Sequence, residues 1–317
     1  MWDHWNVPVN DYDPLGNYDN VINFVADFHH EKKVTKVHCD RFVPGKHSSE
    51  LIADSTIEFL RNTPKEKPFF CYTAFLAPHD PRTMPEQYRK MYEGKEINLP
   101  KNLSNEYPVV YQGNWMRDEM LTPYPRTEKR TKEEIKDYYA MITHLDHEIG
   151  RIIDVLKKTG QEENTIIVLA GDNGLSLGSH GFMGKQNLYE ESITVPLVMK
   201  GPGIRKGTIM DNKIYLMDIY PTLCDLLELK IPDSVEGESF IDALRGVKGP
   251  SREEMYYIMM DRARGIRNGD FKFCIYTYPD AGKSSEVLFN IREDPLEITN
   301  LAQNSKYRST KEPMSAT

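Results

Sequence analysis

The sequence predicts an α/β protein with a mostly parallel sheet flanked by helices and a small antiparallel sheet near its C-terminal end. Apolar runs at residues 68–77, 165–170 and 195–200 are typical of buried strands, and they alternate with segments of helical periodicity. This alternation favours a parallel sheet. Beyond residue 256, short apolar runs flank Asn268-Gly269, a pair that favours a two-residue hairpin.

The composition is that of an ordinary globular protein. Of the 317 residues, 39% are hydrophobic and 28% are charged. No apolar run approaches the ~18 residues that indicate a membrane span. The net charge of −8 provides no general attraction to nucleic acid, so an anionic substrate would need a local site. We therefore expect neither a nucleic-acid partner nor a membrane one.

The first third of the chain predicts a helix, a strand and a long loop. Residues 51–60 carry apolar side chains in a helical pattern that ends near Asn62-Thr63-Pro64. The run 68–77, closed by Pro78, predicts a strand buried on both faces. Residues 93–130 are rich in Pro, Asn and Tyr with weak periodicity, which favours a long loop that walls a cleft.

The clearest helix leads into a strand that ends in polar residues. A capping box of Thr131 and Glu134 predicts its start, and Gly160 predicts its end. The apolar run 165–170 then predicts a buried strand, which places Asp172-Asn173 at its C-terminal end. In open α/β sheets, ligands bind at this edge.

The rest of the chain completes the predicted organisation. A strand at 195–200 and a helix at 218–229 belong to a main α/β domain of residues 1–250. Residues 251–303 predict a small antiparallel subdomain. The polar residues 304–317 predict a disordered tail.

The cysteines predict no metal site. Cys39, Cys71, Cys224 and Cys274 are scattered without metal-ligand spacing, and three of them lie in apolar segments. We therefore expect buried free thiols.

Chemistry-bearing residues gather after the strand 165–170. Oxygen ligands from Asp172 and Asn173 suit a hard divalent cation, and the ammonium of Lys185 can donate to an anion held by that cation. The pattern indicates metal-assisted chemistry on an oxyanion ester. An Asp-Asn-Gly turn and a solvated loop lysine are the structural alternatives.

Several short motifs occur in a fixed order along the chain: Ala77-Pro78-His79-Asp80-Pro81, Gly171-Asp172-Asn173-Gly174, Gly178-Ser179-His180-Gly181, Gly184-Lys185, Leu188-Tyr189-Glu190-Glu191-Ser192 and Val195-Pro196-Leu197. This ordered set resembles the sulfatase family, within the alkaline-phosphatase-like superfamily. The resemblance implies an alkaline-phosphatase-like fold and hydrolysis of the sulfuric ester of a sulfated carbohydrate or aryl sulfate.

The resemblance also implies roles for individual residues. In the family, a formylglycine attacks sulfur while a calcium ion bridges the sulfate oxygens. Asp172 and Asn173 would then be calcium ligands. Lys185 would hold a sulfate oxygen, and His79 would contact the sulfate or the leaving oxygen as the second catalytic residue.

Two further residues are predicted to bind substrate. His180 would line the pocket or would orient its loop, and Arg82 would meet a second anionic group. Asn at position 173, where a zinc phosphatase would favour His, disfavours a zinc site. His144 and His147 are three residues apart on a predicted helix, but no third ligand lies nearby to make them a metal site.

The family's formylglycine motif, Cys/Ser-x-Pro-x-Arg, does not occur in this sequence. The run from Cys39 to Val43 lacks both its Pro and its Arg. The paired N-terminal acids that complete the family's calcium site are also missing, and the first residues resemble a later part of the family's sequence. We therefore expect a chain that begins late, has an incomplete set of calcium ligands and has impaired turnover or none, because the activated nucleophile is absent.

Other interpretations stay open. A non-catalytic protein or fragment that binds sulfated glycans would use the same oxyanion site. A metal-dependent phosphodiesterase or phosphonate hydrolase of the same superfamily is a third candidate. The chain has no signal-peptide pattern, and the resemblance suggests a periplasmic or secreted location for a full-length form.

Overall fold

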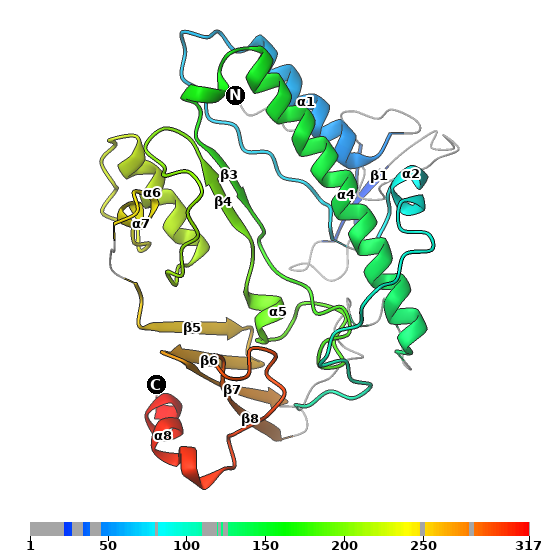
Figure 1. Cartoon of the computed structure of the whole chain (residues 1–317), viewed down its shortest axis with the longest axis vertical. Helices are drawn as coiled ribbons and strands as arrows, with labels where there is room; N and C mark the ends of the chain where they lie inside the picture. The colour runs from blue at the N-terminus through cyan, green and yellow to red at the C-terminus, as the bar shows by residue number, and fades with distance from the viewer. Residues whose placement is uncertain are drawn as a thin grey trace. The chain divides into compact units, whose positions relative to one another are not determined.

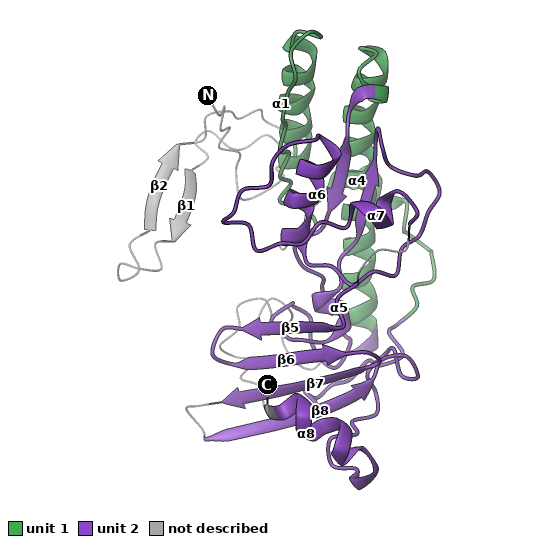
Figure 2. Cartoon of the chain, turned by 90° about the vertical axis from the view of Figure 1, so that its left-hand side faces the viewer, with its two compact units in different colours: residues 1–98, 129–163 green, residues 99–128, 164–317 purple. Residues whose placement is uncertain are grey.

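The chain folds into two compact units. A computed structural model describes residues 22–26, 34–38, 46–79, 82–109, 119, 122, 126–247, 251–278 and 282–316. Unit 1 comprises residues 1–98 and 129–163, and unit 2 comprises residues 99–128 and 164–317 (Figure 2). The predicted domain boundary near residue 250 falls inside unit 2.

Helix α1, Ser48–Asn62, confirms the first predicted helix (Figure 1). The side chain of His47 accepts a hydrogen bond from Ser49 N, and the carboxylate of Glu50 accepts one from His47 N. This reciprocal capping satisfies donors that the first turn leaves unpaired. The chain leaves the helix at Thr63, before Pro64, because proline disfavours a helical conformation in the residue that precedes it.

Helix α4, Glu128–Lys158, confirms the long predicted helix but begins three residues earlier than the capping box indicated. Thr131, expected at the cap, is instead fully buried in the first turns. The helix packs Ala140 and Met141 against Ala77, Met84 and Tyr88, the last of which lies in the short helix α2, Glu86–Lys90. Neither α4 nor any other described helix combines the length and apolarity needed to cross a bilayer.

The predicted buried strand at 68–77 is wrong. This segment has no strand structure, and Phe70 and Tyr72 are 69% and 77% exposed. A strand needs a neighbour to complete its ladder of N–H and C=O groups, and no described strand pairs with this segment. Cys71 is consequently exposed, against the prediction for the cysteines, whereas Cys224 and Cys274 are buried and free as expected. Cys39 lies outside the described residues.

The predicted strands 165–170 and 195–200 exist as β3, Ile167–Ala170, and β4, Leu197–Lys200. They pair antiparallel, with Ala170 opposite Leu197. In the N-terminal region β1, Ile22–Ala26, and β2, Val34–His38, also pair antiparallel. The described pairs therefore include no counterpart of the predicted parallel pairing.

The chain between β3 and β4 is irregular apart from the one-turn helix α5, Glu190–Ile193. It thus lacks the long crossover helix that usually joins parallel strands. Beyond β4, the turn Leu216–Asp218 and helix α6, Ile219–Leu226, confirm the helix predicted at 218–229, and the short helix α7, Ile241–Leu244, follows.

The predicted C-terminal antiparallel sheet is confirmed. Its strands are β5, Glu254–Met259, β6, Ala263–Asn268, β7, Phe271–Tyr278, and β8, Lys283–Asn290, in the order β5-β6-β7-β8 (Figure 1). Asn268 pairs with Phe271, so the two-residue turn is Gly269-Asp270, one position later than the Asn-Gly pair suggested. Gly269 has a φ of +56°, in the left-handed region that glycine favours.

The predicted disordered tail is also wrong. Residues Ser305–Tyr307 form a 3₁₀ turn, and Arg308–Ala316 form helix α8. Met314 of this helix is buried with Ile266, Phe273 and Leu288 of the sheet. Tertiary packing of a few apolar side chains thus orders a segment whose polar composition disfavours a core of its own.

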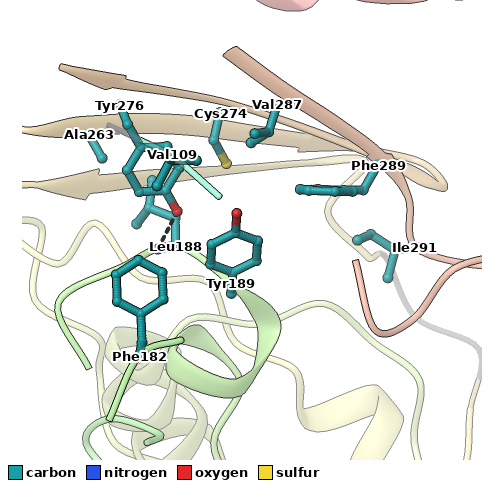
Figure 3. Close-up of a cluster of buried hydrophobic side chains, with 10 residues drawn as sticks. All are labelled: Val109, Phe182, Leu188, Tyr189, Ala263, Cys274, Tyr276, Val287, Phe289 and Ile291. Atoms are coloured by element: carbon teal, nitrogen blue, oxygen red, sulfur yellow. Dashed lines mark hydrogen bonds between the residues drawn. The ribbon is translucent and has the colours of Figure 1, made fainter. Parts of the chain in front are cut away.

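A hydrophobic cluster, which we name the central cluster, joins the β3–β4 connection to the C-terminal sheet. Figure 3 shows Tyr189 and Phe182 beneath the strands that carry Tyr276 and Phe289. Leu188 N donates a hydrogen bond to Tyr276 Oη at 2.9 Å, and this bond holds the β3–β4 connection close to the sheet. The members are Val109, Phe182, Leu188, Tyr189, Ala263, Cys274, Tyr276, Val287, Phe289 and Ile291.

Two buried histidines lie between α1 and α4 in unit 1. His47 and His144 are each 1% exposed, and their ring centroids are 4.9 Å apart. The ring of His144 also stacks on Tyr88 at 4.7 Å. Burial lowers the pKa of His47 to about 4 and that of His144 to about 3.

These two histidines predict acid sensitivity. Because the unfolded chain takes up protons near pH 6.5 and the folded chain does not, stability should be complete above that pH and should fall as the pH drops toward 4. Each proton contributes a slope of about 1.4 kcal/mol per pH unit. Urea unfolding at pH 7 and pH 5 measures the slope. The variant His144→Gln should lose the part of the slope that one proton contributes. Equal slopes in the wild type and this variant would contradict the prediction.

Candidate functional site

Two of the six predicted site residues lie in unit 1. His79 is half-buried in the turn that follows the cis Ala77-Pro78 bond, and its backbone N–H donates to Leu76 O at 3.0 Å. Arg82 forms an ion pair with Glu134 of α4, and its side chain is 7% exposed. Glu134 thus neutralises the positive charge of Arg82, which was predicted to meet a second anionic group of the substrate. The roles of His79 and Arg82 stay predictions.

Asp172 and Asn173 follow the C-terminal end of β3 in unit 2, as predicted, and both are exposed. Asn173 Nδ2 donates to Ser192 O at 2.8 Å and to Gly174 O at 3.0 Å, so the amide has a fixed orientation. Among the described residues, no donor reaches the Asn173 carbonyl oxygen or the Asp172 carboxylate. Both groups are therefore available as oxygen ligands.

Gly174 allows the close approach of two backbone segments at this point. Its N–H donates to Ser192 O at 2.9 Å, and a Cβ built on it would lie 1.9 Å from Glu191 O. Only glycine can therefore occupy this position without displacing the chain.

A chain of buried hydrogen bonds connects Asn173 with the loop that carries Lys185. Ser176 Oγ lies 3.2 Å from Ser192 Oγ, and Asn187 Nδ2 donates to Ser176 Oγ at 3.0 Å. Ser176 N donates to Gly184 O at 2.9 Å. The predicted metal ligands and Lys185 thus belong to one hydrogen-bonded framework within unit 2.

Lys185 itself is partly exposed, and no described residue pairs with its ammonium group. The backbone before it is unusual, because Leu177, Gly178, His180 and Gly181 all have positive φ values. The N–H groups of this turn are used internally: Gly178 N donates to Phe182 O at 2.7 Å, and His180 N donates to Asn102 O at 2.9 Å. An oxyanion bound here would therefore be contacted by the Lys185 ammonium and not by the backbone N–H groups of this turn.

His180 is buried, and its ring stacks on Tyr189 with centroids 3.8 Å apart. Its Nε2 lies 3.0 Å from Asn102 Nδ2. Burial lowers the pKa of His180, although the nearby carboxylate of Glu191 opposes the shift. The two predicted roles of His180, lining the pocket and orienting its loop, both stay predictions.

One group of ligand-type side chains was not anticipated from the sequence. His180, Glu191 and Glu297 each bring one ligand atom within 4.8 Å of the others. Asn102 Nδ2 lies 2.6 Å from Glu191 Oε1 and 3.0 Å from His180 Nε2, and Lys272 Nζ lies 2.6 Å from Glu297 Oε1. We interpret the group as a buried hydrogen-bond network rather than as a metal centre.

Lys272 of β7 is the cation of this network and is fully buried. Its ammonium donates to Leu188 O at 2.8 Å and to Glu190 Oε1 at 2.9 Å, and it pairs with Glu297. Burial alone would lower the pKa of Lys272, but the carboxylates of Glu297 and Glu190 raise it. Burial raises the pKa of Glu297 to about 7 against the attraction of Lys272.

A second buried ion pair was also missed by sequence reasoning. Arg126 Nη2 lies 2.6 Å from Glu119 Oε2, and the two side chains are 0% and 1% exposed. Arg126 also donates to Gly181 O, and the Glu119 carboxylate accepts from the backbone N–H groups of Met183 and Gly184. Both residues lie in the predicted long loop 93–130, whose composition contained no signal for a buried pair.

Two family models match this chain. A family model described as "Sulfatase" matches residues 1–229, and one described as "N-sulphoglucosamine sulphohydrolase, C-terminal" matches residues 178–317. The chain belongs to the sulfatase family. The resemblance predicted from the ordered motifs is confirmed.

Among sulfatase relatives, the arylsulfatase of Clostridium perfringens is 32% identical over 272 residues, which cover 83% of this chain and 55% of the relative. This chain therefore spans about half the length of the curated relatives it matches.

Solved structures give the fold of this sulfatase-family chain. A structure described as BT4656 in complex with its substrate D-glucosamine-2-N,6-O-disulfate has a TM-score of 0.73, at 22% identity, over 90% of this chain and 70% of that one. The phosphonate monoester hydrolase of Agrobacterium radiobacter has a TM-score of 0.67, at 23% identity, over 84% and 59%. The predicted α/β, alkaline-phosphatase-like fold class is confirmed.

The close approach at Gly174 predicts a strong effect of one methyl group. Gly174→Ala should destabilise the protein by about 1–3 kcal/mol, because the added Cβ overlaps Glu191 O. The control is Gly150→Ala in α4, where no atom lies within 4 Å of the added Cβ. That change should stabilise by roughly 0.5–1 kcal/mol, and chemical unfolding measures both. A Gly174→Ala protein as stable as the wild type would disprove the overlap.

The ion pair Glu119–Arg126 predicts that breaking a buried pair costs far more stability than breaking an exposed one. Arg126→Met should destabilise by about 3–5 kcal/mol, because it leaves a buried carboxylate without its cation. As a control, Asp154→Asn removes a pair in which both side chains are more than half exposed, and it should cost less than about 1 kcal/mol. Denaturant unfolding of both variants tests the prediction, which fails if the two losses are equal.

Proposed function

We propose that this chain acts in sulfuric ester hydrolysis on a sulfated carbohydrate and that Asp172, Asn173 and Lys185 bind the sulfate group through calcium and an ammonium. One observation carries the proposal. Three ligand-type groups, an exposed carboxylate, an exposed amide oxygen and a partly exposed ammonium, lie without described partners on one hydrogen-bonded framework. Groups that serve only structure are normally paired, as Glu119 and Lys272 are here.

The donor set fits calcium. Carboxylate and amide oxygens are hard ligands that suit this ion, although calcium takes about 6–8 of them and the two described residues supply only part of the set. When bound, calcium would offset negative charge on the sulfate oxygens. Asp172 would provide the charged ligand. Asn173, oriented by its hydrogen bond to Ser192 O, would provide a neutral one.

Lys185 would hold a second sulfate oxygen. Its ammonium offers three donors and a full charge on a flexible stem, while the backbone beneath it is fixed by hydrogen bonds on both sides. The Cys/Ser-x-Pro-x-Arg motif is absent from these 317 residues. We therefore propose that the chain alone binds the ester far better than it hydrolyses it.

The substrate class rests on the comparisons. The C-terminal family model is that of an N-sulphoglucosamine sulphohydrolase, and one structural neighbour was solved with a glucosamine disulfate. A sulfated amino sugar is thus the substrate class we favour. The likeness to a phosphonate monoester hydrolase supports a second candidate, the cleavage of a phosphonate ester.

Calorimetric titration tests the proposal. Calcium should bind saturably and should strengthen the binding of glucosamine 6-sulfate. Lys185→Met should weaken binding of the sugar roughly 10- to 100-fold, the expected loss for one charged hydrogen bond. Lys230→Met, at an 85% exposed lysine, should change nothing.

Absence of saturable calcium and sugar binding would refute this function. Tighter binding of phenylphosphonate than of the sulfated sugar, together with a preference for zinc or manganese over calcium, would instead favour the phosphonate hydrolase.

A further inference from the structure

We propose that Glu119 is a positioning residue for Lys185. It fixes the backbone of residues 181–185, which we name the Lys185 turn, and thereby sets how strongly Lys185 binds an anion. The part of this inference that concerns anion binding rests on the proposed function. The part that concerns the backbone stands on contacts within unit 2.

The carboxylate of Glu119 holds the two residues directly before Lys185. Its Oε1 accepts from Gly184 N at 2.8 Å, and its Oε2 accepts from Met183 N at 3.1 Å. The Glu119 side chain is 1% exposed, and Met183 is equally buried. Water therefore cannot replace this acceptor without opening the loop.

Arg126 neutralises the buried carboxylate of Glu119 and holds the other end of the Lys185 turn. It pairs with Glu119 and donates to Gly181 O and Glu119 O. The turn is thus held at the carbonyl of Gly181 by the cation and at the amides of Met183 and Gly184 by the anion. Hydrogen bonds with one charged partner are about twice as strong as neutral ones, so this clamp is stiff.

Lys185 depends on this clamp because nothing described holds its side chain. Its four-carbon stem is flexible, so the region that its ammonium can reach is determined chiefly by the position of the Lys185 backbone. The opposite side of the turn is held by Ser176 N, which donates to Gly184 O at 2.9 Å. Without Glu119, two buried N–H groups lose their acceptor, and the turn must rearrange to reach water or another acceptor.

The experiment compares wild type, Glu119→Gln, Lys185→Met and the double variant. The first readout is hydrogen exchange at the amides of Met183 and Gly184, measured by NMR in the full chain. The second is titration with inorganic sulfate. Glu106→Gln is the matched control, since it makes the same chemical change at an exposed position of the same segment. If Glu119→Gln does not fold, Glu119→Gln/Arg126→Met replaces it, because that pair leaves no buried charge.

We expect the Met183 and Gly184 amides to exchange at least about tenfold faster in Glu119→Gln, as expected for loss of a charged hydrogen bond. Sulfate binding should weaken about tenfold in Glu119→Gln, yet less than about twofold when the same change is made in Lys185→Met. The control should match wild type in both readouts. A merely structural residue would weaken binding equally in both backgrounds.

Unchanged exchange at both amides, or additive effects of the two substitutions on sulfate binding, would overturn the inference. If wild type binds no sulfate, the proposed function fails, and amide exchange then decides the positioning role by itself. Fast exchange confined to these amides in Glu119→Gln would support that role, and wild-type exchange would end it.

Discussion

The buried ammonium of Lys272 is the interaction on which the arrangement of unit 2 depends. A buried charge is tolerated only when opposite charges and hydrogen-bond partners surround it. Lys272 has three such partners in two places: Leu188 O and Glu190 on the β3–β4 connection, and Glu297 beyond β8. The C-terminal sheet and the segment that bears the candidate site must therefore come together for either to be satisfied. These contacts connect the C-terminal sheet with the β3–β4 connection inside unit 2.

The β3–β4 connection is held on two sides by different kinds of interaction. On the sheet side, Leu188 and Tyr189 join the central cluster, where removal of apolar surface from water provides the stabilisation. On the other side, Glu119 and Arg126 form directional hydrogen bonds with its backbone, and Asn102 donates to the side chain of Glu191. Apolar packing sets the distance between layers, whereas hydrogen bonds to charged groups set the conformation of each turn.

A division of roles among polar residues follows from this construction. The paired and buried ones, such as Glu119 and Lys272, support the backbone. Asp172 and Lys185 are left without described partners at the surface, where ligand can reach them. His180 was the one candidate that the sequence left open between the two roles. It is buried, stacks on Tyr189 and contacts Asn102, and its role stays a prediction.

Errors in the sequence-based fold came from positions where distant partners decide the outcome. Residues 68–77 have the apolar pattern of a buried strand, yet no described strand pairs with them, and Phe70 remains exposed. Residues 304–317 have a polar composition that favours disorder, yet Met314 meets an apolar patch on the sheet. The ion pair of Arg82 with Glu134, 52 positions away, likewise depends on a distant partner, and the predicted role of Arg82 toward an anion stays a prediction.

The sequence by itself determined the family, the fold class, the main helices, the C-terminal sheet and the place of Asp172-Asn173 after β3. These depend on local periodicity and on ordered motifs, which are visible in one chain. Only the tertiary structure decided which polar residues support the site, because Glu119, Asn102 and Lys272 lie in different segments and become partners only when the chain folds. Burial and pairing are properties of neighbours in space, and the order of residues alone does not contain them.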